Sequence, residues 1–104
     1  MFQERGIALV YYLYLYDCKR AREANARRVS FTKELYGFMY SWKTKGGYRE
    51  KRKPGLLEEC SGSTAVTASA ILVPPEHRAA FQALFESYQD ILITKTFEVS
   101  KELN

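Results

Sequence analysis

The order of the expected elements predicts an α+β protein with a ferredoxin-like β-α-β-β-α-β arrangement, extended by a basic β-hairpin over residues 38–53. Three observations lead to this prediction. Alternating apolar strands stand near both ends of the chain, segments with helical composition or spacing follow or precede them, and a Gly-Gly pair marks a hairpin between them. At 104 residues the chain has room for one core, so residues 1–104 are expected to form a single domain.

The first expected element is a strand from Ile7 to Tyr16, because its residues are β-branched, aromatic or leucine. One side of its period-2 pattern is mainly leucine and the other is mainly tyrosine. Apolarity on both sides predicts a strand inside a sheet. Helices would cover one face, and tyrosines with hydrated hydroxyls would shield the other. Asp17 is expected to close the strand.

A helix is expected from Cys18 to Tyr36, a stretch rich in Ala, Arg, Lys and Glu. Gly37 stands where a left-handed C-terminal cap belongs. Arg28 interrupts the apolar stripe of this segment, which predicts a bend near Val29 with a fresh helix start at Ser30.

Residues 38–53 are expected to form a hairpin with a two-residue turn at Gly46 and Gly47. This turn pairs Lys45 with Tyr48 and sets the register of the whole hairpin. The predicted cross-strand pairs are Tyr40 with Lys53, Trp42 with Lys51, and Thr44 with Arg49. Two aromatic rings and three cations would then share one face.

The remaining segments complete the expected order. Pro54-Gly55 ends the hairpin, residues 56–59 form a short turn, residues 61–64 form a loop and residues 66–73 form one strand. Pro74-Pro75-Glu76 begins a helix whose stripe lies at +3, +4 and +7 spacing, made of Phe81, Leu84, Phe85 and Tyr88. The last expected strand is 91–99, with an inner face of Ile91, Ile93, Phe97 and Val99, followed by a frayed end.

The ferredoxin-like arrangement places both helices on one face of an antiparallel sheet and leaves the other face open. An open apolar face and a tyrosine-rich first strand are a large exposed surface for so small a domain. We therefore expect self-association, most simply as a homodimer.

Positive charge is concentrated in one third of the chain. The net charge is +4, but residues 19–53 hold twelve Lys or Arg against three acids, a net of +9. The remainder holds four basic and nine acidic residues, a net of −5. A basic face of this kind attracts polyanions, whereas the plainer alternative is a solvated surface.

The hairpin face predicts contact with DNA or RNA, because aromatic rings offer stacking surfaces to bases and cations neutralise phosphates. A basic ribbon could also enter a major groove. Arginines of the first helical segment would extend the surface if that segment lay beside the hairpin. The expected contact residues are Tyr40, Trp42, Lys45, Arg49, Lys51 and Lys53, extended by Arg27, Arg28, Arg20 and Arg22. In the alternative, the aromatic rings pack into the core beneath the basic side chains.

The sequence carries no catalytic motif, and the expectation leans away from an enzyme. Asp17 supports one alternative, because Tyr12 to Asp17 resembles the end of the first strand in small ferredoxin-like nucleases associated with CRISPR systems. The resemblance implies a metal-dependent nuclease with Asp17 at a dimer interface. A third alternative is a dimer that senses a ligand or binds a partner protein.

Two cysteines and one histidine are too few for a zinc site, so no metal or cofactor is expected. Cys18 and Cys60 are expected to be free thiols, with a disulfide between them as the alternative. The longest apolar run, residues 7–16, is too short to cross a bilayer and lacks a cleavage pattern. The sequence therefore predicts a cytoplasmic protein that does not span a membrane.

Overall fold

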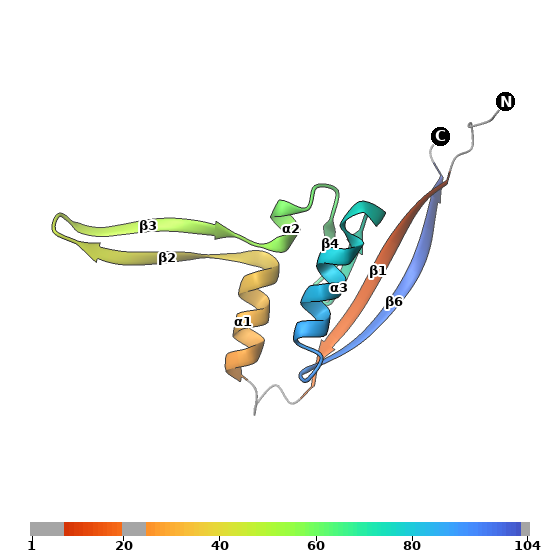
Figure 1. Ribbon diagram of the computed structural model, residues 1–104, viewed down its shortest axis with the longest axis horizontal. Coiled ribbons are helices and arrows are strands. Elements are labelled where there is room, and N and C mark those ends of the chain that lie inside the picture. Colours follow the sequence, from red (N-terminus) through yellow and green to blue (C-terminus); the bar gives the residue numbers. More distant parts are fainter. Residues whose placement is uncertain (1–7, 20–24, 103–104) are drawn as a thin grey trace.

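Two separate antiparallel sheets form the framework of this α+β protein (Figure 1). The computed structural model describes residues 8–19 and 25–102. The larger sheet has the strand order β4-β5-β1-β6, with β1 (Ala8–Cys18), β4 (Thr64–Thr67), β5 (Ala70–Val73) and β6 (Leu92–Glu102). The smaller sheet pairs β2 (Gly37–Thr44) with β3 (Gly47–Pro54). The helices are α1 (Asn25–Tyr36), the short α2 (Leu56–Glu59) and α3 (Arg78–Ser87), which follows the 3-10 turn η1 (Pro75–His77).

The ferredoxin-like topology is not confirmed, because the strand order differs from the expected one. The predicted hairpin forms, but it projects away from the larger sheet instead of joining it (Figure 1). The strand expected over residues 66–73 is split into β4 and β5, which pair with each other. Thr67 Oγ1 accepts a hydrogen bond from the Ser69 amide at 3.2 Å, so this polar pair forms the turn that splits the segment.

Strand β1 turns its tyrosine side toward the helices, the reverse of the expected orientation. Tyr14 is fully buried, whereas Leu15 on the opposite side is exposed. The buried hydroxyls find partners within the fold: Tyr14 donates to Gln82 Oε1 at 3.3 Å, and Tyr16 donates to the Ala68 carbonyl at 3.0 Å. Burial, followed by the contact with the Tyr36 hydroxyl, raises the pKa of Tyr16. Because these hydroxyls are paired, the larger aromatic surface can face the core.

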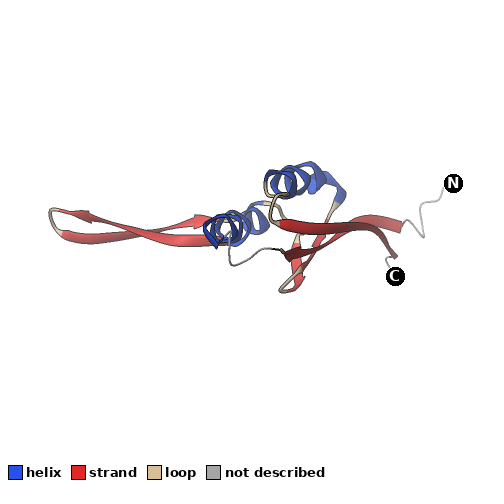
Figure 2. Ribbon diagram, turned by 90° about the horizontal axis from the view of Figure 1, so that it is seen from below, coloured by secondary structure: helices blue, strands red, loops and turns tan. Residues whose placement is uncertain are grey.

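The core is an aromatic cluster shared by the larger sheet and both long helices. The Phe31 ring of α1 lies 5.4 Å from Tyr16, 5.7 Å from Phe85 and 5.4 Å from Tyr88, between ring centroids. Since Tyr16 contacts rings from α1 and α3, both helices pack on the same face of the sheet (Figure 2). The stripe predicted for α3 is confirmed, because Phe81, Leu84, Phe85 and Tyr88 are all buried.

The other face of the larger sheet is open. Leu15, Ile93 and Phe97 are exposed by 37%, 52% and 48%. The expected inner face of the last strand is therefore wrong for Ile93 and Phe97. Pairing of β6 with β1 opposes Ile93 to Asp17 and Phe97 to Leu13, which places both on the leucine side of the sheet. Ile91 is buried, but it precedes the strand.

Helix α1 runs without a break through Val29 and Ser30, so the expected bend is wrong. Phe31 and Leu35 supply its buried side, and Arg28 is half-buried without interrupting the helix. Gly37 ends the helix at φ +85°, as predicted for a left-handed cap. Residues 20–24, with Arg20 and Arg22, lie outside the described residues. Strand β1 also continues through Asp17 to Cys18, and β6 extends to Glu102 rather than fraying at Ser100.

Cys18 and Cys60 are free thiols, so the disulfide alternative is not formed. Cys60 lies in the core cluster and Cys18 packs against it. Burial raises the pKa of both thiols. Across the described parts of the chain, no helix has the length and apolarity needed to cross a membrane.

Replacing Phe31 with alanine tests the aromatic cluster. Because Phe31 is 2% exposed and contacts three rings, Phe31→Ala should lower the free energy of unfolding by about 3–5 kcal/mol in urea titrations. Val29→Ala, on the same helix but 38% exposed, is the control and should change it by less than about 0.5 kcal/mol. Equal losses for the two variants would contradict this description of the core.

Candidate nucleic-acid interface

The ribbon, defined as β2 and β3, leaves the body at a close contact between two glycines. A Cβ atom on Gly37 would lie 2.6 Å from the Lys53 carbonyl oxygen and 2.7 Å from the Gly55 nitrogen. A Cβ on Gly55 would lie 2.3 Å from the Gly37 nitrogen and 2.4 Å from the Tyr36 carbonyl carbon. Backbone atoms cannot yield to such overlaps, so only glycine fits at either position. The two ends of the ribbon are thereby pressed directly against the end of α1.

Glu58 of α2 stabilises the place where β2 begins and β3 ends, which we call the root of the ribbon. Its carboxylate accepts hydrogen bonds from the Arg52 guanidinium and, at 3.1 Å, from the Gly55 amide. Arg52 also donates to the Tyr36 carbonyl at 2.9 Å, so one side chain of β3 bonds both α1 and α2. The Arg52 guanidinium, followed by the Gly55 amide, holds the pKa of Glu58 below its ordinary range.

The register of the ribbon differs from the predicted one by two residues. Thr44 pairs with Gly47, so the turn is Lys45-Gly46 rather than Gly46-Gly47. The observed rungs are Phe38 with Lys53, Tyr40 with Lys51, and Trp42 with Arg49. A shift of two residues keeps every side chain on its original face. The predicted face of aromatic rings and cations is therefore present with different partners.

The aromatic ladder, which we define as Phe38, Tyr40 and Trp42, runs along one face of β2. Ring centroids of Phe38 and Tyr40 are 6.0 Å apart, and those of Tyr40 and Trp42 are 5.6 Å apart with planes inclined by 29°. Tyr40 is 41% exposed and Trp42 is 43% exposed. These two rings lie on the projecting ribbon and do not belong to the core (Figure 1). The alternative in which they pack beneath basic side chains into the core is not supported.

Cations flank the ladder along its whole length. Lys53, Lys51 and Arg49 stand opposite its three rings on β3, and all three are exposed. Lys33 of α1 adds a fourth cation, with its Nζ 4.9 Å from the Phe38 ring centroid. Over residues 37–54 the chain has six Lys or Arg and one Glu, a net charge of +5. Lys45 stands in the turn, at the far tip of this surface.

Arg27 and Arg28 lie on the body, near the start of α1 and therefore at the opposite end of that helix from the ribbon. Arg27 donates to both carboxylate oxygens of Asp90 at 2.6 and 3.2 Å and to the Ser87 carbonyl at 2.8 Å. Its guanidinium also lies 4.4 Å from the Tyr88 ring centroid, and the hydrogen bond with Asp90 raises its pKa. Arg28 donates to Asn25 at 2.7 Å. The structure brings the six predicted residues of the hairpin together and leaves these two arginines apart from them.

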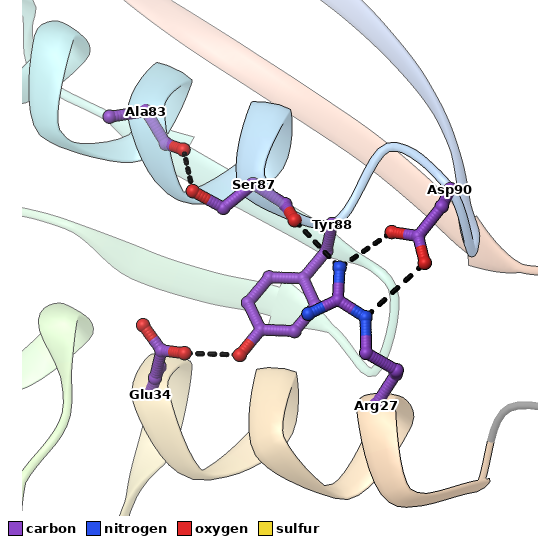
Figure 3. Close-up of polar contacts among 6 residues, drawn as sticks. All are labelled: Arg27, Glu34, Ala83, Ser87, Tyr88 and Asp90. Carbon is purple, nitrogen blue, oxygen red and sulfur yellow. Dashed lines mark hydrogen bonds and ion pairs between the residues drawn. The ribbon is translucent and has the colours of Figure 1, made fainter.

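A groove of about 400 Å³ lies at the root of the ribbon and was missed by the sequence reasoning. It is bounded by α1, α2, α3 and the Phe38–Lys53 pair near the start of the ribbon. Its lining also includes Lys33, Glu34, Leu56, Glu59, Ala83 and Leu84. The Glu34 carboxylate accepts a hydrogen bond from the Tyr88 hydroxyl (Figure 3). No local sequence pattern predicts this groove, because residues from α1, α2, α3 and both strands of the ribbon form it.

Asp17 lies on the open face of the larger sheet. It shares a shallow hollow there with Leu15, Ile93 and Lys95. Within residues 8–19 and 25–102, no three side chains of His, Cys, Asp or Glu gather in a way that could hold a metal ion. Asp17 therefore belongs to no such cluster among these residues.

Comparisons of the chain with protein-family models, with curated proteins and with solved structures give no match. Its function is therefore inferred from the geometry of the ribbon and its root.

Acidification should weaken the hydrogen bonds between Glu58 and the root of the ribbon. Folding lowers the pKa of Glu58, so the ionised carboxylate stabilises the folded protein. This contribution is fully present above the ordinary glutamate pKa and is lost as the pH falls through the lowered value. The Gly55 amide resonance, followed by NMR, should shift with a midpoint below the ordinary glutamate range.

Glu58→Gln should abolish that titration, whereas Glu59→Gln, which leaves the bridge to Arg52 intact, should preserve it. A Gly55 amide that titrates unchanged in Glu58→Gln would show that another group controls the root.

Proposed function

We propose that this protein is a small nucleic-acid-binding module and that the ribbon is its contact surface. The observation that carries the proposal is the exposed aromatic ladder with a cation opposite each ring. Stacking on an aromatic side chain contributes about 1–3 kcal/mol per base, and each cation that meets a phosphate adds salt-dependent affinity. The contact residues are Tyr40, Trp42, Lys45, Arg49, Lys51 and Lys53.

The energetics of the ribbon favour a binding role over a purely structural one. A two-stranded ribbon is at best marginally stable by itself, and exposed rings stabilise the rest of the molecule little. Like charges along β3 repel each other, which costs further stability. A polyanion would relieve that repulsion and cover the rings at the same time.

We also propose that the body is a variant of the ferredoxin-like fold that carries the ribbon and α2 as an insertion. When these are set aside, the remaining elements follow the sequence order β1, α1, β4, β5, α3 and β6. In this arrangement the insertion extends from the end of the first helix and leaves the larger sheet intact.

A homodimer through the open sheet face is a further part of the proposal. The face presents the exposed apolar residues Leu15, Ile93 and Phe97 together with the acid Asp17 and the base Lys95. Two copies related by a twofold axis could place each Asp17 near the other copy's Lys95, so the face complements itself in charge as well as in apolarity.

Trp42→Ala tests the contact surface. Because Trp42 is 43% exposed, its loss should weaken binding to labelled oligonucleotides by about 1–3 kcal/mol and leave the melting temperature nearly unchanged. Met39→Ala, on the opposite face of β2, is the control and should bind as the parent does. A large fall in melting temperature without a change in affinity would overturn the assignment.

The contribution of the cations is tested by the salt dependence of binding. Replacing Arg49, Lys51 and Lys53 together with serine should flatten the slope of log affinity against log salt by up to about three units. Lys51→Ser and Lys43→Ser form a matched pair, because Lys43 lies on the other face of the ribbon. Only the first should reduce the slope by about one unit, and an unchanged slope in the triple variant would remove these residues from the phosphate contact.

Light scattering tests the dimer. The parent chain should have a mass of twice 12.0 kDa at micromolar concentration, and Phe97→Asp should reduce it to the monomer value. Thr96→Asp, an adjacent exposed position on the other face of β6, should leave the dimer intact. A parent mass of 12.0 kDa would refute the dimer.

A further inference from the structure

We infer that the ligand of the ribbon is a single-stranded nucleic acid and that one of its bases enters the groove at the ribbon root. The inference rests on the proposed function and adds to it the strandedness of the ligand and a second binding element. Two independent features support it: the spacing of the rings, and the composition of the groove.

The ring spacing does not match a stacked strand. Neighbouring rings of the ladder are 6.0 and 5.6 Å apart, whereas neighbouring bases in a duplex are about 3.4 Å apart along the strand. Successive bases can contact successive rings only after they have separated from one another. Bases that are unpaired and splayed apart meet this condition, and they stack readily on aromatic side chains.

The rings also leave surface for such contacts. The centroid distance of 5.6 Å exceeds the separation of two fully stacked planes, and Tyr40 and Trp42 are 41% and 43% exposed, so neither ring is fully covered by the other. The gap is too small for a base to insert between them, since that needs about twice the 3.4 Å stacking distance. Bases therefore lie against the exposed side of the ladder.

The groove combines an apolar lining with charges of both signs. Leu56, Ala83 and Leu84 contribute apolar surface, and Phe38 adds a ring. A carboxylate accepts hydrogen bonds and repels phosphate, so Glu59 favours the amino edge of a base within the groove. Glu34 is already bonded to Tyr88. The volume of about 400 Å³ falls in the range of small-molecule sites.

Cations stand where the phosphates of that nucleotide would pass. Lys33 and Lys53 line the groove from α1 and β3, and Lys33 lies 4.9 Å from the Phe38 ring centroid. Phe38 belongs both to the groove and to the ladder, so the two surfaces are continuous. A strand whose phosphates follow Arg49, Lys51 and Lys53 along β3 is led directly to the groove.

The experiment compares a labelled single-stranded oligodeoxycytidylate or oligocytidylate, whose bases carry an amino group, with a duplex of the same length, using fluorescence anisotropy at one salt concentration. Either single strand should bind on the order of tenfold more tightly than the duplex, because only unpaired bases reach the ladder and the groove.

A variant that fills the groove tests whether a base enters it. Ala83 is exposed and lines the groove, so Ala83→Leu should weaken single-strand binding on the order of tenfold without lowering the melting temperature. Ala79→Leu is the matched control, because Ala79 is equally an exposed residue of α3 but does not line the groove.

The outcomes distinguish a failure of this inference from a failure of the proposed function. Equal affinity for single strand and duplex overturns the inferred strandedness. Single-strand affinity that is unchanged in Ala83→Leu overturns the role of the groove, while weaker binding by Trp42→Ala still supports the ribbon. If neither ligand binds even at low salt, the proposed function itself fails.

Discussion

The contact between Gly37 and Gly55 is the constraint on which the arrangement of this molecule depends. It lets the end of α1, the first residue of β2 and the last of β3 meet at backbone distance, so the ribbon leaves the body at one defined point. Glu58 then bonds Arg52 and the Gly55 amide across this point. Without that close approach, a side chain would separate the ribbon from the helix, and the groove between them would lose its shape.

The direction of the ribbon is also set from within the core. Helix α1 is held to α3 by the Phe31 and Phe85 rings, and to the turn after α3 by the Glu34–Tyr88 hydrogen bond and the Arg27–Asp90 ion pair (Figure 3). These contacts are spread along the helix, so α1 cannot easily rotate about its axis. Because β2 begins where α1 ends, the packing of the helix decides which way the aromatic ladder faces.

Aromatic residues serve two different roles in the two halves of the molecule. In the body, Tyr14 and Tyr16 are buried, and hydrogen bonds to Gln82 and the Ala68 carbonyl satisfy their hydroxyls. On the ribbon, Tyr40 and Trp42 have similar chemistry but face outward beside cations. The contrast arises because the body offers a second layer to cover its rings, whereas Tyr40 and Trp42 lie on the projecting part of the ribbon and stay 41% and 43% exposed. The ribbon therefore keeps its aromatic surface for a ligand.

The sequence by itself determined the features that depend on neighbours along the chain. The hairpin, the helix of Phe81 and Phe85, the left-handed cap at Gly37 and the shared face of Tyr40, Trp42 and Lys51 follow from periodicity and turn residues. Even the wrong register kept the faces right, because strand side chains alternate with a period of two. The tertiary structure alone decided that the tyrosine side of β1 is buried and that the hairpin stands outside the sheet. Each of these features depends on which of two surfaces gains more free energy by burial, and the two surfaces are distant in the sequence. The local spacing of residues does not indicate that difference.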